Sequence, residues 1–97
     1  IEAQACGTRV IVSNATAQPE LVGDGWIANV QPLWDPFQNS WLYTPMIPSI
    51  IDALEQAYAA ERGPSEKAIS FASQYAADRV YAEHWRPVMD RLATWRP

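Results

Sequence analysis

Two short runs of β-branched and apolar residues, at positions 9–13 and 26–30, place the strongest constraint on how this chain folds. The first run is nearly all apolar, which is typical of a strand buried on both faces of a sheet. Turn-forming residues lie between the two runs, and Gly23-Asp24-Gly25 is the strongest turn signal among them. We therefore predict two short strands. Because two strands do not make a stable sheet alone, we expect them to belong to a larger α/β domain.

The segment that follows, residues 31–47, is predicted to be a long irregular loop rich in aromatic side chains. Four prolines and two tryptophans fall within residues 31–48. Loops of this length are often functional, although the segment is equally compatible with a surface loop that packs its aromatics onto the core. Trp34 and Trp41 are therefore weak candidates for stacking on a base or a sugar, because hydrophobic cover explains them as well.

From residue 48 onward the pattern becomes helical. Apolar residues recur along one helix face, and Gly63-Pro64 then interrupts the helix. Two further helical stretches are predicted over residues 65–80 and 81–95. The expected organisation is thus a helix end with strands over residues 1–30, the aromatic loop over 31–47, and helices over 48–97. The apolar positions of the first helix are Ile50, Ile51, Leu54, Ala57 and Tyr58.

Charge and cysteine content exclude several classes of function. The 97 residues carry a net charge of −4, and the seven basic residues are spread singly, which argues against binding to a nucleic-acid backbone. The single cysteine, Cys6, rules out an internal disulfide and a zinc-ligand pattern, and we expect a buried thiol there. No apolar run is long enough to span a membrane. A cytoplasmic protein is the expectation.

Two strings near the start of the chain resemble a known family. The first string contains Glu2-Ala3, Ala5, Cys6-Gly7-Thr8 and Val10-Ile11, and the second contains Pro19-Glu20-Leu21-Val22 and Gly25. Together these residues resemble the C-terminal nucleotide-sugar-binding domain of retaining GT-B glycosyltransferases, in particular the family 4 group. A weaker similarity in the later helices extends the resemblance over most of the chain. Two positions depart from the family pattern: Arg9 stands where proline is usual, and Ala28 lies roughly where glycine is common.

The resemblance implies a fold, an activity and a site. The fold is the C-terminal half of a Rossmann-like GT-B domain, with a few short parallel strands followed by about three helices. The activity is transfer of a sugar from a nucleotide sugar, such as a UDP- or GDP-sugar, to an acceptor, without a metal or other cofactor. Glu2 matches the second of the family's two glutamates, which accepts hydrogen bonds from the ribose hydroxyls.

The resemblance also implies that other parts of such an enzyme lie outside this chain. The first glutamate would fall eight positions before Glu2, and the diphosphate-binding residues and the N-terminal acceptor domain are missing as well. We therefore expect a fragment that is inactive by itself, with no catalytic residue to assign. Asn14 and Thr16 are weak candidates for ligand contact, because they follow a strand at the end where α/β folds bind ligands.

A second interpretation is a non-catalytic α/β module. Such a module would self-associate, or bind a partner, through the Trp-rich segment that holds Trp34 and Trp41. The open strand edges of a small sheet make association plausible under either interpretation.

Overall fold

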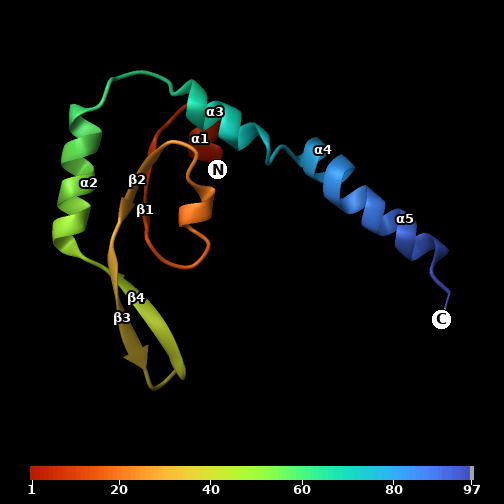
Figure 1. Cartoon of the computed structure of the whole chain (residues 1–97), viewed down its shortest axis with the longest axis horizontal. Coiled ribbons are helices and arrows are strands. Elements are labelled where there is room, and N and C mark those ends of the chain that lie inside the picture. Colours follow the sequence, from red (N-terminus) through yellow and green to blue (C-terminus); the bar gives the residue numbers. More distant parts are fainter. Residues whose placement is uncertain (97) are drawn as a thin grey trace.

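The first elements are a short helix and two parallel strands, in a computed structural model that describes residues 1–96 (Figure 1). Helix α1 (Glu2–Ala5) precedes strand β1 (Val10–Ser13), which pairs in parallel with β2 (Gly25–Ala28). A 3-10 turn, η1 (Pro19–Leu21), lies in the connection between them. The two predicted strands are confirmed, and their pairing is parallel as expected.

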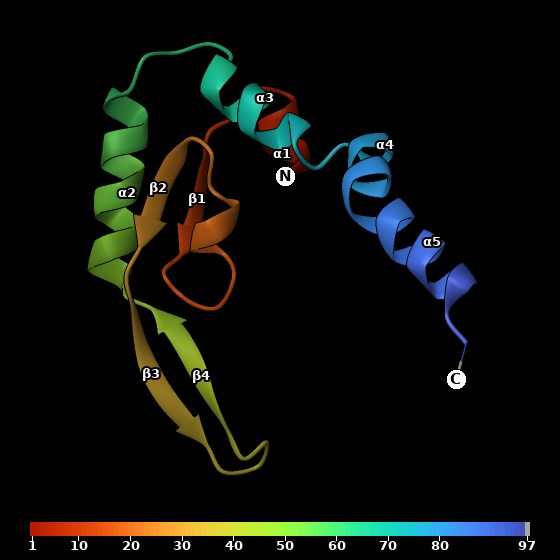
Figure 2. The ribbon, with the colours of Figure 1, turned by 45° about the vertical axis from the view of Figure 1, so that its right-hand side comes forward.

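Residues 30–45 form a β-hairpin, so the prediction of an irregular loop there was wrong. Strand β3 (Val30–Asp35) pairs antiparallel with β4 (Ser40–Pro45), and the hairpin extends away from the other strands (Figures 1 and 2). A two-stranded ribbon leaves one edge of each strand unpaired, so proline is tolerated within it. At the turn, the Phe37 amide donates to Asp35 Oδ1 at 2.9 Å, and Asn39 adopts a left-handed φ of 48°.

Three helical stretches follow the hairpin, as predicted. Helix α2 (Ile47–Ala59) packs beside β2, and α3 (Glu66–Ser73) packs against α1. The third stretch is an arm that runs from α4 (Ala77–Val80) through a π-helical turn, η2 (Tyr81–Trp85), into α5 (Arg86–Thr94). Both ribbon views show this arm leaving the rest of the molecule (Figures 1 and 2). The structure is therefore mixed α/β, with a few short strands and three helical stretches.

The molecule is flat and buries little apolar surface. Its dimensions are 55 × 44 × 13 Å and its radius of gyration is 18.3 Å, whereas a compact chain of this size has a radius of about 13 Å. Within residues 1–96 the fully buried apolar side chains are four alanines, and many larger ones are exposed. Alanine buries too little area to fix the relative positions of elements by itself. The buried alanines are Ala28, Ala53, Ala68 and Ala72.

The buried side chain of Gln4 fixes helix α1 to the turn before β2. Its amide nitrogen donates to the carbonyl of Leu21 at 2.7 Å, and its Oε1 accepts from the amides of Gly23 at 2.7 Å and Asp24 at 3.3 Å. Only 1% of Gln4 is exposed. These bonds join two stretches of backbone that are far apart in the sequence. They hold α1, and with it Glu2, in a defined position beside the strands.

Truncation of Gln4 should therefore destabilise the fold. We expect Gln4→Ala to lower the free energy of unfolding by about 2–4 kcal/mol, because three backbone groups would lose their partner. The measurement is urea denaturation followed by circular dichroism. Gln56→Ala, at an exposed position of α2, is the matched control and should change stability little. Equal stability of the two variants would contradict this role of Gln4.

Candidate functional site

Glu2 presents its carboxylate to solvent at one side of α1. The side chain is fully exposed. A backbone hydrogen bond within Glu2 lowers the pKa of the carboxyl group. The group is therefore ionised at neutral pH, as an acceptor for two hydroxyl donors must be.

A shallow cavity of about 340 Å³ lies beside Glu2, between α1 and α3. Its walls are mostly apolar, with Ala5, Ile69 and Tyr75 among them. The ring of Tyr75 packs against that of Phe71, with 5.5 Å between the ring centres. This surface offers a carboxylate beside apolar walls, which is the kind of environment that a nucleoside can occupy.

The side chain of Asp24 ties the strands to helix α3. Its Oδ2 accepts from Nε of Arg9 at 2.9 Å and from the hydroxyl of Ser65 at 2.5 Å. Ser65 in turn caps α3, because its Oγ accepts from the amide of Ala68 at 3.1 Å. The bond from Ser65 is the main cause of a lowered pKa for Asp24, and Arg9 and Lys67 lower the pKa further.

Asn14 and Thr16 lie at the opposite end of β1 from α1, where the parallel strands end. The Asn14 side chain donates to Oδ1 of Asn29 at 3.3 Å, and its backbone amide donates to the carbonyl of Ala28 at 2.8 Å. Thr16 has a left-handed φ of 55°, and its hydroxyl donates to the carbonyl of Ala15. Asn14 is thus brought to the base of the hairpin, and Thr16 bonds within its own loop.

Trp34 and Trp41 face each other across the hairpin. They form a cross-strand pair, with 5.3 Å between the ring centres and 67° between the ring planes. This edge-to-face geometry stabilises the hairpin itself. Figure 1 places α1 and the hairpin at opposite ends of the β1–β2 pair. The five sequence candidates therefore fall into two groups: Glu2 on α1, and Asn14, Thr16, Trp34 and Trp41 at the other end.

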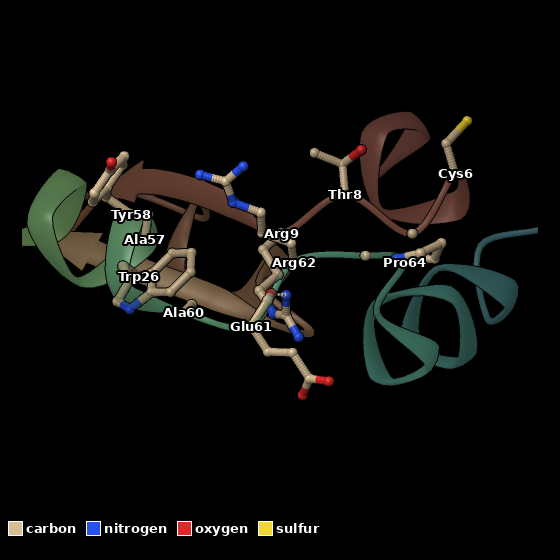
Figure 3. Close-up of a pocket in the computed structure, with 12 residues that line it drawn as sticks. Cys6, Thr8, Arg9, Trp26, Ala57, Tyr58, Ala60, Glu61, Arg62 and Pro64 are labelled. Carbon is tan, nitrogen blue, oxygen red and sulfur yellow. Dashed lines mark hydrogen bonds between the residues drawn. The ribbon is translucent and has the colours of Figure 1, made fainter.

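A second cavity, of about 520 Å³, was not predicted from the sequence (Figure 3). It is lined by Trp26, Tyr58 and Arg62, among others, and lies where β1 and β2 begin. Arg9 is engaged there, because its Nη1 donates to the carbonyl of Glu61 at 2.8 Å and its Nε pairs with Asp24. Because Arg9 is already engaged with Asp24 and Glu61, we assign no function to this cavity.

Cys6 lines the rim of this second cavity and is exposed. The prediction of a buried thiol was therefore wrong. The cause is the end of α1, where Cys6 follows the last helical residue and Gly7 turns with a φ of +81°. Gly7 is the buried residue at this position, packed against Pro64, and a side chain there would crowd that ring.

Within residues 1–96 no group of three metal-ligating side chains comes together. Over the same residues, every helix is too short or too polar to cross a membrane. Comparisons with protein-family models, curated proteins and solved structures found no match to this chain.

The lowered pKa of Asp24 makes a prediction about stability and pH. A carboxyl group with a depressed pKa in the folded state stabilises that state above its unfolded pKa of about 3.9, and this contribution is lost as the pH falls through the folded value. We expect the urea midpoint of the protein to fall as the pH drops below about 4. Asp24→Asn should be less stable than the unchanged chain at pH 7 and should approach it in acid.

Urea titrations at pH 7, 5, 4 and 3 provide the measurement. Asp52→Asn, which changes an exposed carboxylate on α2, is the matched control and should follow the unchanged chain at every pH. A constant stability difference between Asp24→Asn and the unchanged chain across this range would contradict the role given to Asp24.

Proposed function

We propose that this chain is part of a retaining, nucleotide-sugar-dependent glycosyltransferase, and that Glu2 binds the ribose of the donor. The observation that carries the proposal is the Gln4 network. Gln4 lies in helix α1, within the first family-like string (residues 2–11). Its hydrogen bonds reach the Pro19–Leu21 turn and the Gly23-Asp24-Gly25 turn, which both belong to the second string (residues 19–25). The residues that carry the resemblance therefore form one physical unit, and this unit leaves the Glu2 carboxylate exposed to solvent.

The chemistry of Glu2 suits this role. An ionised carboxylate offers two oxygens to the two vicinal hydroxyls of a ribose, and both bonds are charge-assisted. Dinucleotide-binding α/β folds use an acidic residue for the same purpose.

The Rossmann-like GT-B assignment is part of this proposal, supported by the parallel β1–β2 pair and the helix before it. We assign no catalytic residue.

The hairpin favours a second function, that of an interaction module. Trp34, Trp41 and Tyr43 are 44%, 57% and 48% exposed, although they lie on paired strands. Exposed apolar clusters of this kind mark binding surfaces. The two functions are compatible, because the hairpin and Glu2 lie at different ends of the molecule.

Nucleotide binding tests the first function. We expect UDP, GDP or ADP to bind more tightly than its 2′,3′-dideoxy counterpart, by at least about tenfold, because a hydrogen bond to a charged group contributes roughly 1.5–3 kcal/mol. In Glu2→Gln this preference for the ribose hydroxyls should disappear. Titration calorimetry, or NMR titration where affinity is in the millimolar range, provides the measurement.

Glu20→Gln is the matched control, since Glu20 is an exposed glutamate within the second family-like string. It should retain the preference of the unchanged chain. If the unchanged chain shows no preference for the ribose hydroxyls, or if Glu2→Gln keeps the full preference, the ribose assignment is wrong.

A further inference from the structure

The hairpin begins at the end of the parallel strands where α/β folds bind ligands. Only Asn29 separates β2 from β3. The carbonyl of Asn29 accepts from the amide of Met46 at 2.8 Å, and its amide donates to the hydroxyl of Ser49 at 2.8 Å. With the bond from Asn14 to Asn29, these contacts fix the base of the hairpin to the carboxyl ends of β1 and β2. In open α/β sheets the ligand crevice lies outside these strand ends.

The register of the hairpin separates its side chains into two unlike faces. Directly paired residues share a face, and successive residues alternate between faces. One face, which we name the aromatic face, consists of the pairs Val30–Pro45, Pro32–Tyr43 and Trp34–Trp41. The opposite face consists of the pairs Gln31–Thr44, Leu33–Leu42 and Asp35–Ser40.

The aromatic face carries no charge and has few polar groups. Residues 25–51 contain one charged side chain, Asp35, and the register places it on the opposite face. The polar atoms of the aromatic face are the indole N–H groups of Trp34 and Trp41 and the hydroxyl of Tyr43. Such a face matches a neutral partner, and it offers ring surfaces with a few donors beside them.

The geometry points to a neutral saccharide as the ligand of the aromatic face. A pyranose ring has apolar C–H faces and hydroxyl edges, so it can stack on an aromatic ring while its hydroxyls meet indole N–H and phenol groups. This inference rests on the proposed function, because a glycosyltransferase acts on saccharides. It adds a binding surface distinct from Glu2.

A second copy of the chain fits this face less well. Three aromatic side chains that are about half exposed offer on the order of 300 Å² per copy. A stable protein interface needs about 800 Å² from each partner. A single saccharide chain requires less area, and Trp34, Trp41 and Tyr43, each about half exposed, provide ring surface for it.

Titration with neutral hexasaccharides tests the inference. The probes are maltohexaose, cellohexaose and mannohexaose, and a hexamer of galacturonic acid is the charged comparison. In ¹H–¹⁵N NMR spectra we expect at least one neutral probe to shift the indole signals of Trp34 and Trp41, and the charged hexamer to bind at least fivefold more weakly. Trp41→Leu, which keeps an apolar side chain but removes the ring, should weaken binding at least fivefold.

Leu42→Thr is the matched control, because it changes the neighbouring residue on the opposite face of the same strand. It should bind the neutral probe as the unchanged chain does. Cross-strand nuclear Overhauser effects between Asp35 and Ser40 report whether the hairpin stays folded in each variant. If Trp41→Leu loses the hairpin, Tyr43→Leu takes its place in the comparison.

Three results would overturn the inference. The first is that no neutral hexasaccharide binds, and the second is that Leu42→Thr weakens binding as much as Trp41→Leu. The third is that the indole signals shift with protein concentration alone, which would identify a second copy as the occupant. Nucleotide binding by Trp41→Leu separates the two proposals: intact ribose preference with no saccharide binding refutes only the role of the aromatic face. Saccharide binding without ribose preference refutes only the role of Glu2.

Discussion

Two polar side chains, Gln4 and Asp24, hold together elements that the apolar core alone would leave loosely joined. Gln4 binds backbone groups on both sides of Val22, and Asp24 binds Arg9 and the cap residue of α3. Hydrogen bonds to buried or charged groups contribute more than exposed ones, and their loss leaves partners unsatisfied. Within residues 1–96 the fully buried apolar side chains are alanines, so packing supplies little directional constraint. The positions of α1, the strands and α3 depend on this network, and Glu2 lies on the first of these elements.

The flat shape explains why so many large apolar side chains are exposed. With a thickness of 13 Å, most elements have a neighbour on one side only. The α5 arm illustrates this, because Trp85, Met89 and Leu92 recur at helical spacing and all are exposed. Exposed apolar surface of this extent is typical of proteins that bind partners. The glycosyltransferase and interaction-module proposals both account for it, since each requires further molecules against these faces.

The sequence predicted the helices and strands that have a strong periodic pattern. It failed to predict the features that depend on pairing between separate segments of the chain. The β-branched run before Asn14 and the apolar spacing around Leu54 predicted a strand and a helix correctly, because each signal is local. The hairpin was missed because its prolines resemble loop residues, although Asp35-Pro36 and Asn39 are turn signals that could have indicated it. The Gln4 network could not be predicted, since it joins residues 17 to 20 positions apart through a side chain with no motif of its own. Of the sequence candidates other than Glu2, Asn14 and Thr16 follow the end of β1, whereas Trp34 and Trp41 pair near the turn of the hairpin.

Native-state hydrogen exchange tests the central claim, that one polar network unites α1, the parallel strands and α3. The amides of Gly23 and Asp24 donate to Gln4, the amide of Ala68 donates to Ser65, and the amide of Ser65 donates to the carbonyl of Gly7 at 2.8 Å. If the network is one cooperative unit, these four amides open with a single free energy and exchange more slowly than those of the α5 arm. Independent opening of these amides, or exchange as fast as in the arm, would contradict the account.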